Sequence, residues 1–442
     1  MRQDAQGLTI TVASEQAAAA FGDVVAGYLT YRADLPQRMA RLLEADPEFG
    51  LAHCLRGYFA MLAFHAGKRG AAEEAAAAAE RLSVRASGRE RAHVAALRHW
   101  IAGEVGRAIA VWDEILVEHP RDVIAFRLAH FLNFWAGRPA AMLASVEQVS
   151  PHWSEAVPGY VSLLACRCFA SEECGLYLPA EEAGREAIAR DPADLWAAHG
   201  VAHVMEMQGR RAEGIAWIAS LAENWDGATN LMHHLWWHAA MFHMERREFE
   251  TVLELYDRRF RDLASPLTQA VPDLYIDMQN AASMLFRLQR HGVDVGDRWV
   301  ELADKAEARI GDTLSGFTLP HWMMALAATG REDAASRMLG AARQAPDEAV
   351  RRLAAPICEA VLAHARGEHA RALAAMRPVL GEMHRLGGSH AQQDVFEQLF
   401  FDAAVKAGAA PDVNLLLERV AGRHPVPPHR RIGYAAAAAG WA

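Results

Sequence analysis

The sequence predicts an all-α fold built from antiparallel helix hairpins, and two observations support this prediction. Nearly every segment from about residue 12 onward reads as an amphipathic helix that ends at Gly, Pro or Asp-Pro, and only LTITV (8–12) is β-like. Proline and glycine also recur at a regular spacing along the middle of the chain. Together these features indicate an array of short helices.

The recurring spacing describes a repeated helix pair. Pro120–Gly137, Pro158–Gly175 and Pro192–Gly209 each lie 17 positions apart, and successive prolines are 38 and 34 positions apart. In such a pair, proline opens the first helix near its first turn, glycine ends it, and a second helix follows. A step of 34 residues is the spacing of tetratricopeptide repeats, so we expect a superhelix of tetratricopeptide-like hairpins.

We expect one continuous helical body over residues 1–442. Residues 1–45 would form an N-terminal helical cap, 46–260 the repeats with a central stretch rich in His, Glu and Trp, and 261–442 further helix pairs and a C-terminal cap. Residues 272–306 look helical with a turn at Gly292–Gly296 and depart from the repeat pattern. The last residues, 431–442, are low in complexity and read as a helical cap or a frayed tail.

Composition excludes several classes of protein. The formal net charge is −10 and no block of Lys and Arg stands apart from acids, which argues against a nucleic-acid partner. No stretch approaches the roughly 20 apolar residues that span a bilayer, and the first residues do not show the pattern expected of an export signal. We therefore expect no membrane association and a cytoplasmic protein. Five cysteines, an odd number, argue against a disulfide framework. Homo-oligomerisation is left open.

The stretch from Asp194 to Asp257 carries the densest sets of ionisable side chains on apolar helical patterns. His199, His203 and Glu206 are spaced i, i+4 and i+7, which places them within about 60° of one another on a helix. Burying such a polar stripe is costly unless its members find partners. The side chains therefore either satisfy one another or meet a ligand.

A second polar stripe follows on the next predicted helix. His234 and His238 are again four residues apart, with Trp236 and Trp237 between them and Glu245 two turns further along the same face. Aromatic side chains at helical spacing usually pack in a core, but aromatic walls with a few polar groups also build pockets.

These residues permit two kinds of chemistry. A divalent metal ion is a candidate cofactor, and its ligands would come from His199, His203, Glu206, His234 and His238 if the two helices face each other. The H-E-x-x-H signature of metalloproteases is missing. In a metal-free acid/base site, one of these histidines would act as the base and Glu206 or Glu173 would orient it. The plain alternative is a packed polar core in which the imidazoles bond one another, Glu172, Glu173 or backbone carbonyls.

A third polar segment is GGSHAQQD (387–394). Gly387 and Gly388 break the preceding helix, and Ser389 is a plausible N-cap of the next one. His390, Gln392 and Asp394 fall in the first turns of that helix. A helix N-terminus can hold a carboxylate or phosphate, although a capped helix start without any ligand is the simpler interpretation. No G-x-S-x-G elbow is present, so we do not expect a serine hydrolase.

Four segments resemble one known family: EECGLY (172–177), WAAHGVAHVMEMQGRRAEGIAWI (196–218), HHLWWHAAMFHMERREFETVLELYD (233–257) and GGSHAQQDVFEQ (387–398). Their order and spacing are similar to those of the tetratricopeptide repeat protein 38-like, or StaR-like, family. The chain has Gln393 where members commonly have Arg, and His233-His234 where they have His-Asn. The resemblance implies an all-α superhelix and assigns no catalytic residues. The family's characteristic polar positions correspond here to Glu172, Glu173, His199, His203, Glu206, His234, His238, Tyr256, Asp257, Ser389, His390, Gln392 and Asp394.

Together these features favour a His/Glu-lined pocket on the inner face that binds a small molecule. Whether the pocket also acts on that molecule, by acid/base or metal-assisted chemistry of the hydrolase or lyase type, is left open. The candidate catalytic residues are His203, Glu206, His238, His199, His234 and Glu173. The candidate substrate-binding residues are Glu172, Trp196, Trp237, Tyr256, Asp257, Ser389, His390, Gln392 and Asp394. The alternative is a non-enzymatic scaffold that binds a peptide or protein, which would spread its polar residues along many repeats.

Overall fold

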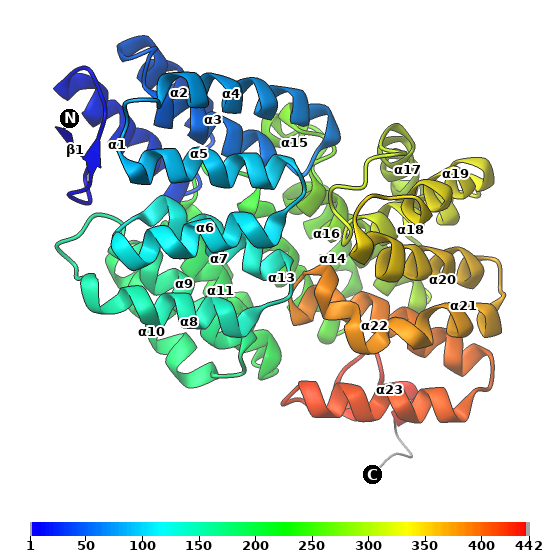
Figure 1. Cartoon of the computed structure of the whole chain (residues 1–442). Coiled ribbons are helices and arrows are strands. Elements are labelled where there is room, and N and C mark those ends of the chain that lie inside the picture. Colours follow the sequence, from blue (N-terminus) through cyan, green and yellow to red (C-terminus); the bar gives the residue numbers. More distant parts are fainter. Residues whose placement is uncertain (1, 439–442) are drawn as a thin grey trace. The chain divides into compact units, whose positions relative to one another are not determined.

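The fold is all-α, as predicted. The computed structural model describes residues 2–438 (Figure 1). Two two-residue strands, β1 (Arg2–Gln3) and β2 (Thr9–Ile10), pair antiparallel before the first helix. The helices of the N-terminal half are α1 (Glu15–Leu29), α2 (Leu35–Ala45), α3 (Gly50–Leu62), α4 (Arg69–Leu82), α5 (Gly88–Ile101), α6 (Val105–Glu118), α7 (Val123–Trp135), α8 (Pro139–Val149), α9 (Tyr160–Glu173), α10 (Tyr177–Arg190), α11 (Leu195–Met207) and α12 (Arg211–Leu221).

The C-terminal half continues in the same way, with neighbouring helices packed as pairs such as α17 with α18 and α20 with α21. Its helices are α13 (Leu231–Glu245), α14 (Phe249–Leu255), α15 (Pro266–Ala270), α16 (Tyr275–Arg290), α17 (Arg298–Ala308), α18 (Leu319–Ala328), α19 (Glu332–Arg343), α20 (Ala355–Ala365), α21 (His369–Met376), α22 (His390–Lys406), α23 (Ala410–Arg423) and α24 (Ala435–Ala438). Short 3-10 turns join several of them, and π-helices occupy Tyr256–Phe260 and Val350–Ala354. Residues 439–442 of the expected C-terminal cap lie outside the described residues.

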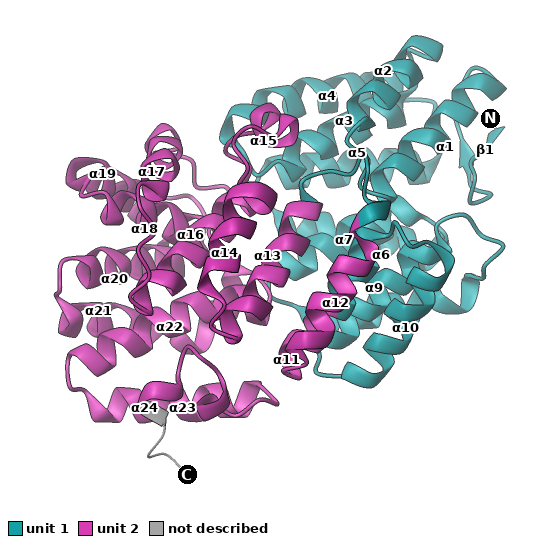
Figure 2. Ribbon diagram, turned by 180° about the vertical axis from the view of Figure 1, so that it is seen from behind, with its two compact units in different colours: residues 1–201, 223–231 teal, residues 202–222, 232–442 magenta. Residues whose placement is uncertain are grey.

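The chain divides into two compact units, coloured separately in Figure 2. Unit 1 comprises Met1–Val201 and Glu223–Leu231, and unit 2 comprises Ala202–Ala222 and Met232–Ala442. The chain therefore passes between the units at three points, and the first of them lies within α11, between Val201 and Ala202. The single continuous body and the superhelix expected from the sequence stay predictions.

The punctuation by proline and glycine matches the helix ends. Gly137, Gly175 and Gly209 follow the ends of α7, α9 and α11 with φ of 65°, 76° and 69°, the left-handed conformation that glycine adopts after a helix. The prolines lie two or three residues before these helices instead of in their first turn. In α7 the reason is Asp122, whose carboxylate accepts a hydrogen bond from the Ala125 amide at 2.9 Å and so makes Asp122 the N-cap.

One close helix contact in unit 2 depends on a missing side chain. A Cβ added to Gly214 on α12 would lie 2.3 Å from the ring of Phe242 on α13. The two helices can approach this closely only because the residue is glycine. Phe242 also lines the cavity described below, so this contact helps to position the wall of the candidate site.

The turn expected at Gly292–Gly296 is present. Helix α16 ends at Arg290, and Gly292 and Gly296 take φ of 76° and 57° before α17 begins. Among the described residues, no helix is both long and apolar enough to pass through a lipid bilayer.

Candidate functional site

Three histidines of unit 2 come together in its interior. His203 lies on α11, and His234 and His238 lie one turn apart on α13. The ring centroids of His203 and His238 are 4.5 Å apart, and those of His234 and His238 are 4.7 Å apart. One ring nitrogen from each lies within 4.8 Å of those of the other two. All three side chains are buried. We call His203, His234 and His238 the histidine triad.

Two members of the triad are oriented by hydrogen bonds at Nδ1. The Nδ1 atom of His238 lies 2.7 Å from a carboxylate oxygen of Glu206, one turn after His203 on α11. The Nδ1 atom of His234 lies 2.9 Å from Oδ1 of Asn280 on α16. Because both partners are oxygen acceptors, each Nδ1 donates a hydrogen. The neutral ring then carries its lone pair on Nε2.

An indole ring holds the triad from one side. The ring of Trp237 stacks on His234 at 5.1 Å with an interplanar angle of 10°, and it meets His238 edge-on at 4.9 Å. The guanidinium of Arg287 lies 5.8 Å from the centroid of the same indole. This packing fixes the ring planes, since a buried side chain among rigid neighbours has few rotamers open to it.

Burial keeps two members of the triad neutral. The pKa of His203 is well below its usual value, first because the ring is buried and then because His238, His234 and His390 would repel its positive charge. The pKa of His234 is lowered in the same way by burial and by His238, although its bond to Asn280 acts in the opposite direction. At neutral pH these two imidazoles carry no charge, which is the state that binds a metal ion or accepts a proton.

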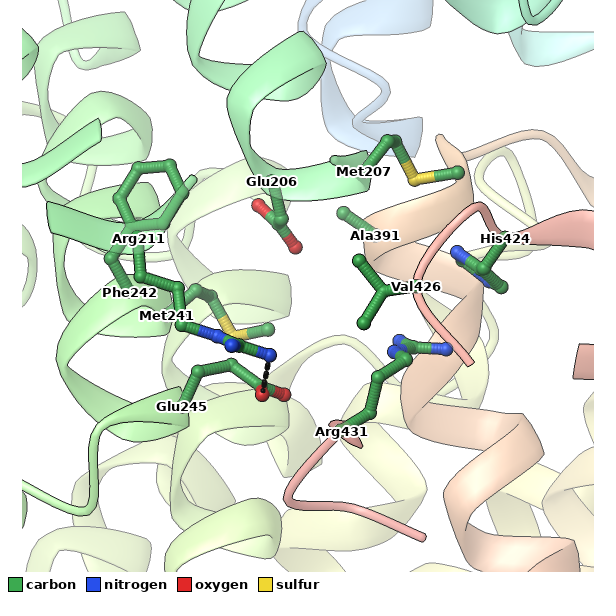
Figure 3. Close-up of a pocket in the computed structure, with 10 residues that line it drawn as sticks. All are labelled: Glu206, Met207, Arg211, Met241, Phe242, Glu245, Ala391, His424, Val426 and Arg431. Atoms are coloured by element: carbon green, nitrogen blue, oxygen red, sulfur yellow. Dashed lines mark hydrogen bonds and ion pairs between the residues drawn. The ribbon is translucent and has the colours of Figure 1, made fainter. Parts of the chain in front are cut away.

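A small cavity of unit 2 adjoins the triad through Glu206, which is one of its walls (Figure 3). Its volume is about 30 Å³, which is enough to hold water. Arg211 donates to Glu245 at 2.8 Å across one side, and the figure shows the carboxylate of Glu206 pointing into the space between these residues and Arg431. Burial raises the pKa of Glu245. The cavity has room for water but not for an organic substrate in this conformation.

The GGSHAQQD segment begins helix α22, as predicted. Ser389 accepts from the Gln392 amide at 3.3 Å, and the Gln392 side chain accepts from the Ser389 amide at 3.0 Å, which forms a capping box. His390 is the first residue of the helix, with its ring 6.2 Å from that of His424. Ser389 and Gln392, which we expected to bind substrate, therefore have a structural role that needs no ligand.

Asp394, on the next turn of α22, lies in a network of charges. It accepts from Arg431 at 2.9 Å and from the hydroxyl of Tyr434 at 2.6 Å, and Arg287 is 3.6 Å away. Burial alone would raise its pKa, but Arg431 and Arg287 hold the pKa well below its usual range. Its carboxylate is satisfied by these cations.

Four candidate residues fall in unit 1. His199 is buried one turn before His203 on α11, with its ring 4.8 Å from Trp196 and 5.2 Å from Phe169. Trp196 in turn stacks with Tyr31 at 6.1 Å. The other two, both buried in the last turn of α9, are Glu172 and Glu173.

The last two candidates belong to unit 2 but lie away from the triad. Tyr256 and Asp257 line a second cavity, described below. Tyr256 and Asp257 therefore do not line the cavity that adjoins the triad.

The sequence did not reveal the role of α16. Asn280 orients His234, and three residues earlier Asp277 lies 3.2 Å from Nδ1 of His233, but neither was among the expected site residues. A signal was present, because Asp277, Asn280 and Arg287 recur at helical spacing and all three are buried. Polar residues on the buried face of a helix were the same evidence that identified α11 and α13.

A search of the chain against models of known protein families found no match.

Proposed function

We propose that unit 2 binds a divalent metal ion of the zinc class through the histidine triad and uses it to act on a small molecule. The observation that carries this proposal is the orientation of two rings by hydrogen bonds at Nδ1. Glu206 orients His238 and Asn280 orients His234, so that each ring, in its neutral form, has its lone pair on Nε2. Metal-binding histidines typically donate their other ring hydrogen to a carboxylate or carbonyl oxygen, which fixes the tautomer.

The number and state of the ligands support the same conclusion. Three protein ligands with a further position open is the arrangement of catalytic zinc sites, and three histidines form one of its common donor sets. Metal binding requires neutral imidazole, and the lowered pKa values of His203 and His234 supply it without a proton being displaced at pH 7. The triad is buried beside Trp237, which separates it from bulk solvent.

The reaction class follows from the groups beside the triad. A divalent ion at such a site lowers the pKa of water and polarises carbonyl groups. Glu206 both accepts from His238 and lines a cavity with room for water, so it is placed to hold or move a proton of a water molecule there. These features favour addition of water to a small molecule, as hydrolases and lyases perform it. The free cysteines are in keeping with a reducing, cytoplasmic setting.

Metal analysis of protein purified without a histidine tag tests the proposal. We expect one equivalent of Zn²⁺ or Co²⁺ to be retained after dialysis, and His203→Asn and His238→Gln to lose it. The matched control is His243→Gln, since His243 lies on the same helix as His238 but is part-exposed and pairs with Glu248. Failure of the folded wild type to retain metal, or equal retention by all variants, would contradict the proposal.

The scaffold alternative makes a different prediction. A peptide-binding scaffold should keep its partner when the triad is removed, because no metal is involved in concave-surface recognition by helical repeats. Loss of both metal and ligand in His238→Gln would favour the metal site.

A further inference from the structure

A second and larger cavity of unit 2 lies between the π-helix at Tyr256–Phe260, the loop that follows it and α17. Its volume is about 560 Å³, within the usual range for small-molecule pockets. Tyr256 and Arg261 line it from the π-helix at Tyr256–Phe260 and the residue after it, and Asp297 and Arg298 line it from the start of α17. π-Helical turns within α-helices are frequent at functional sites.

Carboxylates dominate the charge of this cavity. Five of them, against two guanidinium groups, give its lining a formal net charge of −3; they are Asp257, Asp262, Asp297, Glu301 and Asp304. Both guanidinium groups are already neutralised by two-pronged ion pairs, one from Arg298 to Asp257 at 2.6 and 2.8 Å and one from Arg261 to Glu301 at 2.7 Å for each bond. Asp304 forms an ion pair with Arg331, which lies outside the lining, so the surplus negative charge comes from Asp262 and Asp297. This surplus favours a cationic ligand.

Two buried donors in the same cavity lack a partner. Among the described residues, neither the hydroxyl of Tyr256 nor the Nη1 atom of Arg261 has a hydrogen-bond acceptor, although both atoms are buried. Tyr256 and Arg261 are only 3% and 2% exposed. Burial, and next the charge of Glu301, raise the pKa of Tyr256, so its hydroxyl keeps its hydrogen at neutral pH. Unpaired buried donors are costly, and a ligand acceptor would satisfy them.

The neighbours of Tyr256 hold its ring in place. Phe260 packs edge-on against it at 5.2 Å, and the guanidinium of Arg298 lies 5.9 Å from its centroid. The ring cannot turn easily to find another acceptor, since it is clamped between these two side chains. The hydroxyl is therefore a fixed recognition group.

We propose that this cavity binds a small zwitterion of the basic amino acid class, whose carboxylate accepts from Tyr256 and Arg261 and whose ammonium groups meet the surplus carboxylates, Asp297 among them. Neither the two unpaired donors nor the surplus carboxylates alone define the ligand. A simple anion would be repelled by the net charge of the lining, and a simple polyamine would leave the two buried donors unsatisfied. The site is separate from the histidine triad and needs no metal.

Isothermal titration of the full chain at low salt, with three probes of similar length, tests this inference. L-Lysine carries both kinds of group, cadaverine has the two amines without the carboxylate, and glutarate has carboxylates without an amine. We expect L-lysine to bind at least tenfold more tightly than cadaverine, since one hydrogen bond to a charged group contributes about that factor. Glutarate should not bind.

Two variants separate the two recognition groups. Tyr256→Phe should weaken L-lysine about tenfold and leave cadaverine unchanged, because it removes only the hydroxyl. Its thermal stability should be at least that of the wild type, because the hydroxyl bonds no described residue and its burial is costly. Asp297→Asn should weaken both probes, and it costs no helix cap, since Asp297 makes no capping bond with its side chain. The matched control is Asp333→Asn, an exposed carboxylate on α19 outside the cavity.

Three results would overturn the inference. They are no heat of binding with L-lysine at millimolar concentration, wild-type affinity for L-lysine in Tyr256→Phe, and binding of glutarate as tight as that of L-lysine.

Discussion

Replacing Glu206 by Gln should weaken metal binding by the histidine triad without removing a ligand. The carboxylate accepts from Nδ1 of His238 at 2.7 Å and makes that ring a stronger electron donor. A glutamine at this position could still accept the hydrogen bond through its side-chain carbonyl, but it would do so without the negative charge. Loss of such an outer partner typically lowers metal affinity 10–100-fold, which is about 1.4–2.7 kcal/mol.

The structure narrows the range of the expected loss in metal affinity. Asn280 would continue to orient His234, and the glutamine side chain would preserve the tautomer of His238, so we expect the lower end, about tenfold. Glu206→Leu removes orientation as well as charge and should approach 100-fold. The ratio between the two variants therefore separates the contribution of charge from that of geometry.

Competition with a chromophoric zinc chelator at pH 7.5 measures both affinities. Glu245→Gln is the control, because Glu245 lines the same cavity and pairs with Arg211 but bonds no member of the triad. Circular dichroism establishes that each variant is folded. Wild-type zinc affinity in Glu206→Gln, or an equal loss in Glu245→Gln, would refute the role we assign to Glu206.

Further predictions concern stability. His321 donates to a backbone carbonyl, and burial lowers its pKa to about 3, whereas its pKa in the unfolded chain is near 6.5. As the pH falls, the unfolded state therefore takes up the proton first. The free energy of unfolding should decrease by about 1.4 kcal/mol per pH unit as the pH drops from 6.5 toward 3. His321→Gln should reduce the loss of thermal stability between pH 7 and pH 5, and an unchanged loss would show that this residue is not responsible. Gly214→Ala should destabilise unit 2 by about 1–3 kcal/mol in denaturant titrations, because the added Cβ meets the ring of Phe242. Asp122→Asn should cost unit 1 about 3–5 kcal/mol, seen as a lower melting temperature, since it replaces the carboxylate nearest to the buried Arg89, at 2.5 Å, by a neutral amide.

Much of the fold could be predicted because it depends on local chemistry. Gly209 marks the end of α11 because the chain there requires a positive φ, and Ser389 marks the start of α22 because its hydroxyl and Gln392 form a capping box. Both signals act within a few residues and are readable from sequence alone.

The candidate site could be predicted only in part, because it depends on which helices face each other. The spacing of His234 and His238 places both on one side of α13 whatever surrounds them. That α16 supplies Asn280 as the partner of His234 follows from the packing of unit 2, which no local pattern encodes. The resemblance of this part of the chain to the tetratricopeptide repeat protein 38-like family also stays a prediction.

The sizes of the cavities could not be predicted from the sequence either. The residues around Glu206 were expected to enclose a substrate pocket, but the adjoining space is about 30 Å³. Tyr256 and Asp257 were expected to serve the same pocket, whereas they line the larger cavity of about 560 Å³. Cavity volume depends on how side chains from distant segments fill space, so single-residue patterns carry little information about it.

The π-helix at Tyr256–Phe260 makes the larger cavity sensitive to the length of the chain. A π-turn holds one residue more than an α-turn, and each residue of an α-helix rotates the chain by about 100° and advances it by 1.5 Å. Deleting one residue after Tyr256 within this segment would restore an ordinary α-helix. Arg261 would then rotate away from Glu301, while Tyr256 would keep its position. One in-frame deletion is thus enough to abolish the zwitterion site in a protein that keeps every one of its helix pairs.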